Sequence, residues 1–157
     1  MLKIFIDADG CPVKDEVYRV ARRYGLEVAL VANSRMHAPS DATIEMIVVD
    51  GKFDAADDWI VEHIGENDVV ITADIPLASR CLKKMAMVLR PTGRDFTEEN
   101  IGDALATREL MSYLRDLGTL TGGPAPFENK DRSRFLHRLD EIVQRTRRKN
   151  QRRPSGD

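Results

Sequence analysis

Cysteine and histidine are scarce in this sequence, which limits the metal and disulfide chemistry that it can support. Among 157 residues there are two cysteines, Cys11 and Cys81, and three histidines, His37, His63 and His137. Neither set has the close spacing that zinc sites use, and a chain long enough to bury a core does not need a disulfide. The composition therefore gives little support to a zinc site and favours a reducing compartment.

Long hydrophobic runs are also missing. No stretch approaches the roughly 18 consecutive apolar residues that a membrane-spanning helix needs, and no basic segment leads into an apolar stretch at the N-terminus. At the same time, 42% of the residues are hydrophobic, which is enough to build a core. We expect a soluble, cytoplasmic protein without a membrane partner.

Charge is distributed unevenly along the chain. The net charge is −2, but residues 145–157 contain six basic residues and one acid, so the acidic excess lies in the first 144 residues. We predict a single domain over residues 1–144 and a basic, flexible tail over residues 145–157. Such a tail is typical of proteins that bind a polyanion, but a solvated segment has the same composition, so contact with RNA or DNA stays open.

Short apolar segments alternate with segments of helical periodicity. Strands are predicted at residues 2–6, 28–32, 44–49, 69–72 and 86–89. Helices are predicted at residues 12–24, 54–64, 76–84, 97–117 and 131–148. Strands that alternate with helices favour an α/β fold with a mostly parallel central sheet.

Four aspartates fall where predicted strands give way to helices. Asp7 and Asp9 follow the first strand, Asp57 lies early in the helix at 54–64, and Asp74 follows the strand at 69–72. In a parallel sheet these positions share one edge, so the four carboxylates are expected to converge. Clustered carboxylates repel one another without a cation, and Mg²⁺ and Mn²⁺ prefer oxygen ligands. We therefore predict catalytic roles for all four, with Asp7, Asp57 and Asp74 as ligands of Mg²⁺ or Mn²⁺.

Structural roles for these acids stay open from the sequence alone. Aspartate often caps helices, so Asp9 is interpreted either as a ligand or as the cap of a helix that begins near Pro12. Within residues 54–58, Asp57 shares the apolar face of its helix, whereas Asp58 is expected to face solvent.

Further polar residues near this edge are candidates for binding substrate. The segment Asn33-Ser34-Arg35 follows the second strand, and Arg80 follows Asp74 by less than two helical turns. We predict Asn33, Ser34 and Arg80 as phosphate-binding residues, with a polar turn as the alternative for Asn33 and Ser34. Cys11 precedes a helix start, but its acidic surroundings oppose thiolate formation, so we expect a packed cysteine.

Several short motifs together resemble the YaiI/YqxD-type family of uncharacterised bacterial proteins. The resemblance reaches to about residue 139, and it implies a three-layer PIN-like domain with helices on both faces of a mostly parallel sheet. The motifs that carry it are Asp7-Ala8-Asp9-Gly10-Cys11-Pro12-Val13, Asn33-Ser34, Asp54-Ala55-Ala56-Asp57, Thr72-Ala73-Asp74-Ile75-Pro76-Leu77-Ala78, Asn100-Ile101 and Gly122-Gly123-Pro124.

The resemblance also implies an activity. PIN-like domains bind magnesium or manganese through acids after the first strand, on a middle helix and after the fourth strand, and they cleave RNA or DNA. Asp7, Asp57 and Asp74 match these places. A fourth acid is expected further along, where Asp95 is the candidate by distance; whether Asp95 or Asp54 completes the site is open.

Three functions are compatible with these residues. The leading hypothesis is metal-dependent nuclease activity, with RNA favoured over DNA as the substrate. Residues 4–10 also resemble the first motif of haloacid-dehalogenase-type phosphatases, in which Asp7 would attack phosphorus and Asp9 would act as acid and base. The third hypothesis is a nucleic-acid-binding or regulatory module without catalysis, based on the basic last helix and tail.

Overall fold

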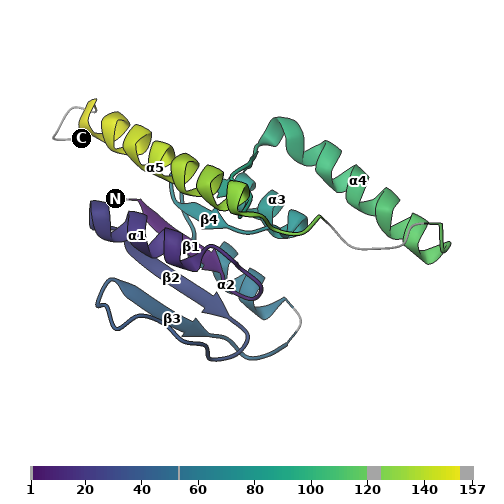
Figure 1. The fold of residues 1–157 in the computed structure, drawn as a ribbon, viewed down its shortest axis with the longest axis horizontal. Helices are drawn as coiled ribbons and strands as arrows, with labels where there is room; N and C mark the ends of the chain where they lie inside the picture. Colours follow the sequence, from purple (N-terminus) through teal and green to yellow (C-terminus); the bar gives the residue numbers. More distant parts are fainter. Residues whose placement is uncertain (1, 53, 120–124, 153–157) are drawn as a thin grey trace.

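One mostly parallel sheet forms the centre of the protein (Figure 1). The computed structural model describes residues 2–52, 54–119 and 125–152, and within them six strands follow the order β3-β2-β1-β4-β5-β6. Neighbouring strands are parallel except for β6, which runs antiparallel to β5. The strands are β1 (Lys3–Asp7), β2 (Glu27–Ala32), β3 (Ile44–Val48), β4 (Val69–Ile71), β5 (Met87–Leu89) and β6 (Asp95–Phe96).

The sheet is covered by helices on both faces, which explains why the centres of its inner strands are apolar. In β1, Ile4 and Ile6 pack into the core on one face and Phe5 packs into the core on the other. All three side chains are at most 1% exposed. A strand buried on both faces has no polar side to alternate with its apolar side. The predicted α/β class and mostly parallel sheet are therefore confirmed.

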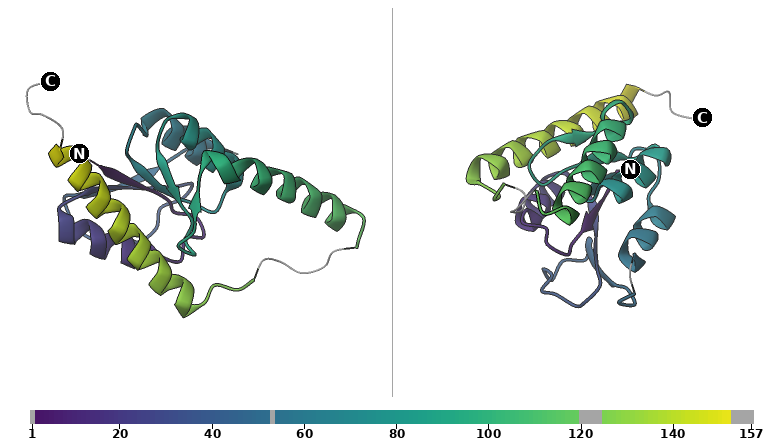
Figure 2. Two further views of the ribbon diagram at one scale, coloured as in Figure 1. Left: turned by 90° about the horizontal axis from the view of Figure 1, so that it is seen from above. Right: turned by 90° about the vertical axis from the view of Figure 1, so that its right-hand side faces the viewer.

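The helices form two layers around this sheet. Helices α1 and α5 contribute to the core on the face of Ile4 and Ile6, while α2 and α3 cover the opposite face (Figures 1 and 2). Helix α4 packs against α3 and projects away from the sheet (Figure 2). The helices are α1 (Lys14–Tyr24), α2 (Ala55–His63), α3 (Ile75–Lys83), α4 (Glu98–Asp116) and α5 (Asn129–Arg152).

Two local features differ from the sequence prediction. Strand β6 was not predicted, because a strand of two residues has no periodicity to detect; it pairs with β5 across a turn in which the Arg90 N–H donates to the Arg94 carbonyl at 2.9 Å. Helix α1 begins at Lys14, so Pro12 precedes the helix and does not occupy its first turn. Val13 is the N-cap residue there.

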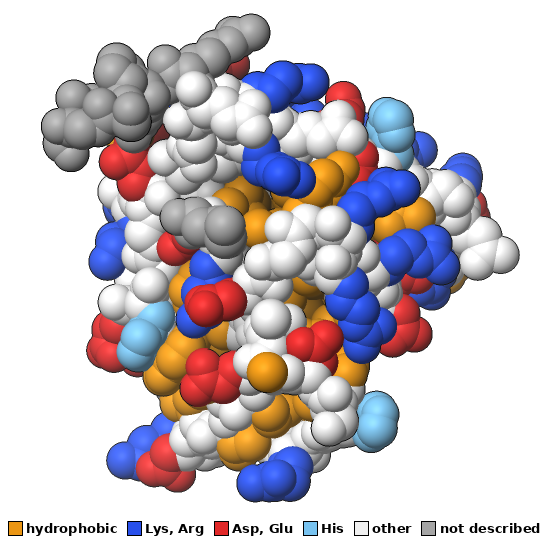
Figure 3. Space-filling model, turned by 90° about the vertical axis from the view of Figure 1, so that its left-hand side faces the viewer, with side chains coloured by type: hydrophobic (Ala, Val, Ile, Leu, Met, Phe, Trp, Pro, Cys, Tyr) orange, Lys and Arg blue, Asp and Glu red, His pale blue; other side chains and the backbone are white. Residues whose placement is uncertain are grey.

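The predicted boundary at residue 145 falls inside α5. Thr146 continues the apolar stripe of Ile142 and Val143 and is 6% exposed, and the Arg147 guanidinium lies 5.1 Å from the centre of the Tyr24 ring. Residues 145–152 of the predicted tail therefore continue the helix. Figure 3 shows the face at the left of Figure 1, where Lys and Arg side chains gather along one side and are elsewhere separated by acidic and apolar side chains.

Some predictions fall on residues that are not described. Residues 122–124 of the family motifs and residues 153–157 of the predicted tail lie outside the described ranges. Among the residues that are described, no helix has both the length and the apolar character needed to cross a bilayer.

Candidate functional site

The strand order brings the predicted acids to one place. β1 pairs with β2 on one side and with β4 on the other, so the direction in which strands are added reverses between β1 and β4. Asp7 is the last residue of β1, and Asp74 lies three residues beyond the end of β4. In open α/β sheets, ligands bind in the crevice beside the strand C-termini at such a reversal.

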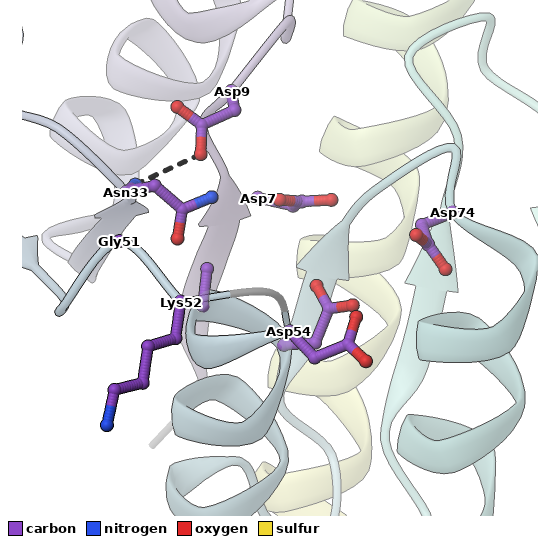
Figure 4. A pocket seen from close by; sticks show the side chains of 9 residues that line it. Asp7, Asp9, Asn33, Gly51, Lys52, Asp54 and Asp74 are labelled. Atoms are coloured by element: carbon purple, nitrogen blue, oxygen red, sulfur yellow. Dashed lines mark hydrogen bonds between the residues drawn. The ribbon is translucent and has the colours of Figure 1, made fainter.

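A cavity of about 440 Å³ opens at this crevice, and all four predicted catalytic aspartates line it. In Figure 4, Asp7 lies between Asp9 on one side and Asp74 on the other, with Asp54 below them. The Lys52 side chain extends away from this group of acids. The full lining is Asp7, Asp9, Asn33, Gly51, Lys52, Asp54, Ala56, Asp57 and Asp74.

A buried threonine fixes the two acids that flank the reversal. The Thr72 hydroxyl donates to Asp7 Oδ2 at 2.7 Å and accepts from the Asp74 N–H at 3.0 Å. Thr72 is 2% exposed, so these two hydrogen bonds satisfy its hydroxyl without water. Asp74 is the N-cap of α3, where its Oδ1 accepts from the Leu77 N–H at 2.9 Å. One oxygen of each carboxylate is thereby held by the protein.

Asp9 is held from the neighbouring strand. Its Oδ2 accepts from the Asn33 N–H at 3.0 Å, at the end of β2 (Figure 4). Helix α1 has no side-chain cap among the described residues, so the interpretation of Asp9 as a helix cap is wrong. Asn33 contributes both the backbone donor for Asp9 and a side chain to the cavity lining.

Helix α2 supplies two further acids from its first turn. Asp54 is the N-cap and has a left-handed backbone with φ of 66°, a conformation that aspartate tolerates better than most residues. Neither the Asp54 nor the Asp57 carboxylate has a hydrogen bond in the described part of the chain. Asp57 lies one helical turn before the fully buried Ile60, which keeps it on the inner side of α2.

The acids raise one another's pKa values. The pKa of Asp57 is raised from 3.8 to about 6, chiefly by burial and then by the nearby charges of Asp74, Asp7 and Asp54, against a smaller opposite effect of Arg80. Burial also raises the pKa of Asp7, an effect that the Thr72 hydrogen bond reduces and the charges of Asp74 and Asp9 increase. The carboxylates are therefore close enough to interact and lack sufficient neutralising charge.

The geometry sets a limit on how an ion could bind. Within the described ranges, no three His, Cys, Asp or Glu side chains are grouped closely enough to hold one ion together. Mg²⁺ usually keeps several waters and takes one or two carboxylates together with substrate phosphates. The donor set of the cavity consists of carboxylates and one amide, which suits a hard cation of this kind.

The remaining predicted residues lie elsewhere. Ser34 and Arg80 do not line the cavity, and Arg80 pairs with Asp58 at 2.9 Å. Asp95, one of two candidates for the fourth acid, also lies outside it and accepts from Arg138 Nε on α5 at 2.9 Å. Of the two candidates, Asp54 is the one in the cavity lining.

Neither cysteine has the properties of a nucleophile. Cys11 is 8% exposed and Cys81 is fully buried. Burial raises the pKa of Cys11, and it raises that of Cys81 to about 12. Cys11 is therefore the packed cysteine that we expected.

Sequence reasoning missed two contributors to the site. Thr72 was taken as the last residue of a strand and as part of a family motif but was given no role at the site, although a hydroxyl two residues before an aspartate at a strand end is a detectable signal. Lys52 was given no role, and nothing in the sequence places it at the cavity.

Comparison with known proteins identifies the family. The family described as "Uncharacterized BCR, YaiI/YqxD family" matches residues 5–145. A UPF0178 protein of Paramagnetospirillum magneticum is 59% identical over 148 residues, which cover 94% of this chain and 98% of that protein. A UPF0178 protein of Rhodospirillum centenum is 55% identical, covering 94% of this chain and 99% of that protein. No solved structure gives a significant match. The chain belongs to the YaiI/YqxD family, as its motifs predicted.

Proposed function

We propose that the protein is a metal-dependent nuclease with a PIN-like fold, which hydrolyses phosphodiester bonds of RNA in preference to DNA. The observation that carries the proposal is the cavity lined by Asp7, Asp9, Asp54, Asp57 and Asp74 at the reversal of strand order. The raised pKa of Asp57 supports it, because carboxylates that lack neutralising charge favour a bound cation. The places of Asp7, Asp57 and Asp74 match those of the acids in PIN-like domains.

Asp7, Asp57 and Asp74 would hold Mg²⁺ or Mn²⁺, directly or through water, and Asp9 would orient the attacking water. The ion, when bound, would activate the water and stabilise the charge that develops on the phosphate. Hydrogen bonds from Thr72, Leu77 and Asn33 fix the carboxylates of Asp7, Asp74 and Asp9. Carboxylates that are fixed in this way preorganise a site for a metal ion.

The same acids determine when substrate binds. Lining acids outnumber Lys52 by five to one, so without added cations the cavity repels an anionic strand. Asp54 and Asp57 have no hydrogen bond to break among the described residues, so they can turn toward an ion. We therefore expect a divalent cation to be required for productive binding as well as for hydrolysis.

The phosphatase alternative gains less support. A phosphatase of the haloacid-dehalogenase type needs a lysine that precedes an acidic pair in the chain, whereas here the acids of residues 54–58 precede Lys83 and Lys84. Lys52 lines the cavity, but its side chain extends away from Asp7 (Figure 4). Lys83 and Lys84 are also misplaced in the fold. Both lie at the C-terminal end of α3, whereas the cavity is formed by Asp74 at the opposite end of that helix. Trapping of a phosphoryl group on Asp7 would restore this hypothesis.

The test is cleavage of an end-labelled single-stranded RNA in Mg²⁺, in Mn²⁺ and in EDTA. We expect cleavage only with metal, and its loss in Asp57→Asn and Asp74→Asn. Asparagine can still cap α3, so Asp74→Asn removes charge while keeping the helix start. Asp58→Asn is the matched control, because Asp58 is a neighbouring but exposed acid outside the cavity.

The outcomes separate the hypotheses. Equal cleavage by the wild type and both cavity variants would show that the activity comes from another site or a contaminant. RNA binding without cleavage in any metal would favour the non-catalytic module. An effect of Asp58→Asn as large as that of Asp74→Asn would show that charge near α2, and not the cavity, sets the activity.

A further inference from the structure

A second cavity of about 660 Å³ adjoins the acidic one and has the opposite charge. It lies between the turn that joins β5 to β6 and the start of α5. Gly10 and Ala73 form part of its lining, and they are the direct neighbours of Asp9 and Asp74 in the chain. The loops that follow β1 and β4 therefore contribute residues to both cavities.

Two arginines in this cavity have no ion-pair partner among the described residues. Four basic side chains line it: Arg90, Arg94, Lys130 and Arg134. Lys130 pairs with Glu128 at 3.2 Å, and Arg134 pairs with Asp131 at 3.3 Å. In the part of the chain that is described, neither Arg90 nor Arg94 has a carboxylate within salt-bridge distance.

The guanidinium of Arg90 is held in place by an aromatic ring. The guanidinium of Arg90 lies 4.2 Å from the centre of the Phe96 ring. Its Nε is buried and has no hydrogen-bond partner among the described residues. Burial and the charge of Arg94 lower the pKa of Arg90, and the charge of Asp95 offsets part of this effect. A guanidinium group with unused donors is suited to bind phosphate.

The turn that carries both arginines is fixed against α5. The Arg90 N–H donates to the Arg94 carbonyl, and the Gly93 N–H donates to the Arg90 carbonyl, each at 2.9 Å. Gly93 has φ of +86°, and a Cβ there would lie 2.7 Å from backbone atoms of Arg134 and Phe135. The arginines are therefore presented on a rigid turn, which reduces the entropy lost on binding.

We propose that this cavity, defined by Arg90 and Arg94, binds a phosphate of a nucleic-acid strand that extends from the phosphodiester bond in the acidic cavity. The inference rests on the proposed function, because the acidic cavity supplies the direction of the strand. The inference also assigns to Arg90 and Arg94 the selection of a nucleic-acid strand over a simple phosphate ester. An acidic centre alone would serve any phosphate ester, whereas a separate cationic site beside it requires a substrate with more than one phosphate.

Binding of a single-stranded, fluorescein-labelled RNA, followed by anisotropy in Mg²⁺ as the salt concentration is varied, tests the proposal. Anisotropy is read only while gels show that the RNA is still intact. The assay therefore measures binding whether or not the protein cleaves RNA. The variants are Arg94→Gln, in which the arginine is exposed, and Arg90→Gln/Arg94→Gln. Arg108→Gln/Arg115→Gln is the matched control, because both residues are exposed on α4 and lie outside the two cavities.

We expect Arg94→Gln to weaken RNA binding by about tenfold, the effect of losing one charge-assisted contact. The slope of log affinity against log salt should fall by about 0.7, the value for one phosphate on a single strand. The control should leave both quantities unchanged. Thermal unfolding of each variant checks that the fold is kept. If loss of the contact between Arg90 and the Phe96 ring destabilises the double variant, the single variant Arg94→Gln still tests the proposal.

Three results would overturn the proposal. In the first, affinity and slope are unchanged in both cavity variants. In the second, Arg147→Gln/Arg148→Gln on α5 weakens binding whereas Arg94→Gln does not, which would place the strand on the last helix. In the third, Arg94→Gln weakens binding of inorganic phosphate but not of RNA, which would mean that the cavity takes a small phosphate compound. Loss of RNA binding in Arg94→Gln without cleavage by the wild type would support this site while refuting the nuclease.

Discussion

Replacement of Asp57 by asparagine is expected to stabilise the protein at neutral pH while abolishing the proposed nuclease activity. Burial and neighbouring acids raise the pKa of Asp57 to about 6 from an ordinary value of 3.8. At pH 7 the folded protein therefore carries a carboxylate that is less favourable there than in the unfolded chain. Asparagine has nearly the same shape and no charge, so this cost disappears.

The sign and the pH window follow from the two pKa values. Between about pH 4 and pH 6 the folded protein binds more protons at Asp57 than the unfolded chain does, so this residue lowers stability as the pH rises through that range. Above about pH 6 the cost is constant, and below about pH 4 it is absent. The variant should therefore gain stability over the wild type at pH 7 and not at pH 4.

The size of the gain can be worked from the pKa change. At about 1.4 kcal/mol for each pKa unit, the full difference would be about 3 kcal/mol. Asp57 is half-buried, so solvent screening reduces this to about 1 to 2 kcal/mol. Added Mn²⁺ should stabilise the wild type by mass action and leave the variant nearly unaffected.

Urea unfolding in EDTA at pH 4, 5, 6 and 7 measures this difference, with Asp58→Asn as the control. Asp58 is exposed and paired with Arg80, so its loss should change stability by less than about 1 kcal/mol and should not stabilise the protein at pH 7. The reasoning is refuted if Asp57→Asn is less stable than the wild type at pH 7. It is also refuted if the gain is equal at pH 4 and pH 7.

Three further predictions concern the surroundings of the site. Thr72→Val keeps the shape of the side chain but removes its hydrogen bonds, including that to Asp7; it should cost about 1 to 3 kcal/mol in urea unfolding and weaken Mn²⁺ binding by about 10 to 100-fold. Gly93→Ala places a Cβ 2.7 Å from the α5 backbone at positive φ, so the unfolding free energy should fall by about 2 to 4 kcal/mol, and an unchanged value would show that the turn is not fixed. Burial and raised pKa values should keep Cys11 and Cys81 unreactive toward a disulfide reagent at pH 8 until urea unfolds the protein, and rapid labelling of the native state would contradict this.

The parts of the fold that depend on local pattern could be predicted from the sequence. The apolar run in β1 and the apolar stripes of the helices are the buried parts of these segments, and their alternation along the chain predicts the α/β class. Strand β6 could not be predicted, because its two residues are specified by the turn before it and by pairing with β5. The predicted helix at 131–148 is shorter than α5 at both ends, and the burial of Thr146, which lies beyond the predicted domain boundary, depends on tertiary contacts.

The candidate site was also predicted in part, where a local rule applies, and not where its geometry depends on tertiary contacts. Convergence of Asp7 and Asp74 followed from the rule that parallel strands end at one edge. The bond from Thr72 to Asp7 could not be predicted, because it requires β1 and β4 to be neighbours. Asp95 was placed by its distance along the chain, but the antiparallel strand β6 and the ion pair with Arg138 hold it outside the cavity.

The central claim is that the acidic cavity binds a divalent cation, and a calorimetric titration of Mn²⁺ into the wild type and Asp74→Asn tests it most directly. Asparagine can still cap α3, so the variant loses charge and not its helix start. We predict saturable binding in the wild type and in the Asp58→Asn control, weakened at least about tenfold in Asp74→Asn. Absence of binding in the wild type, or equal binding in Asp74→Asn, would contradict the account.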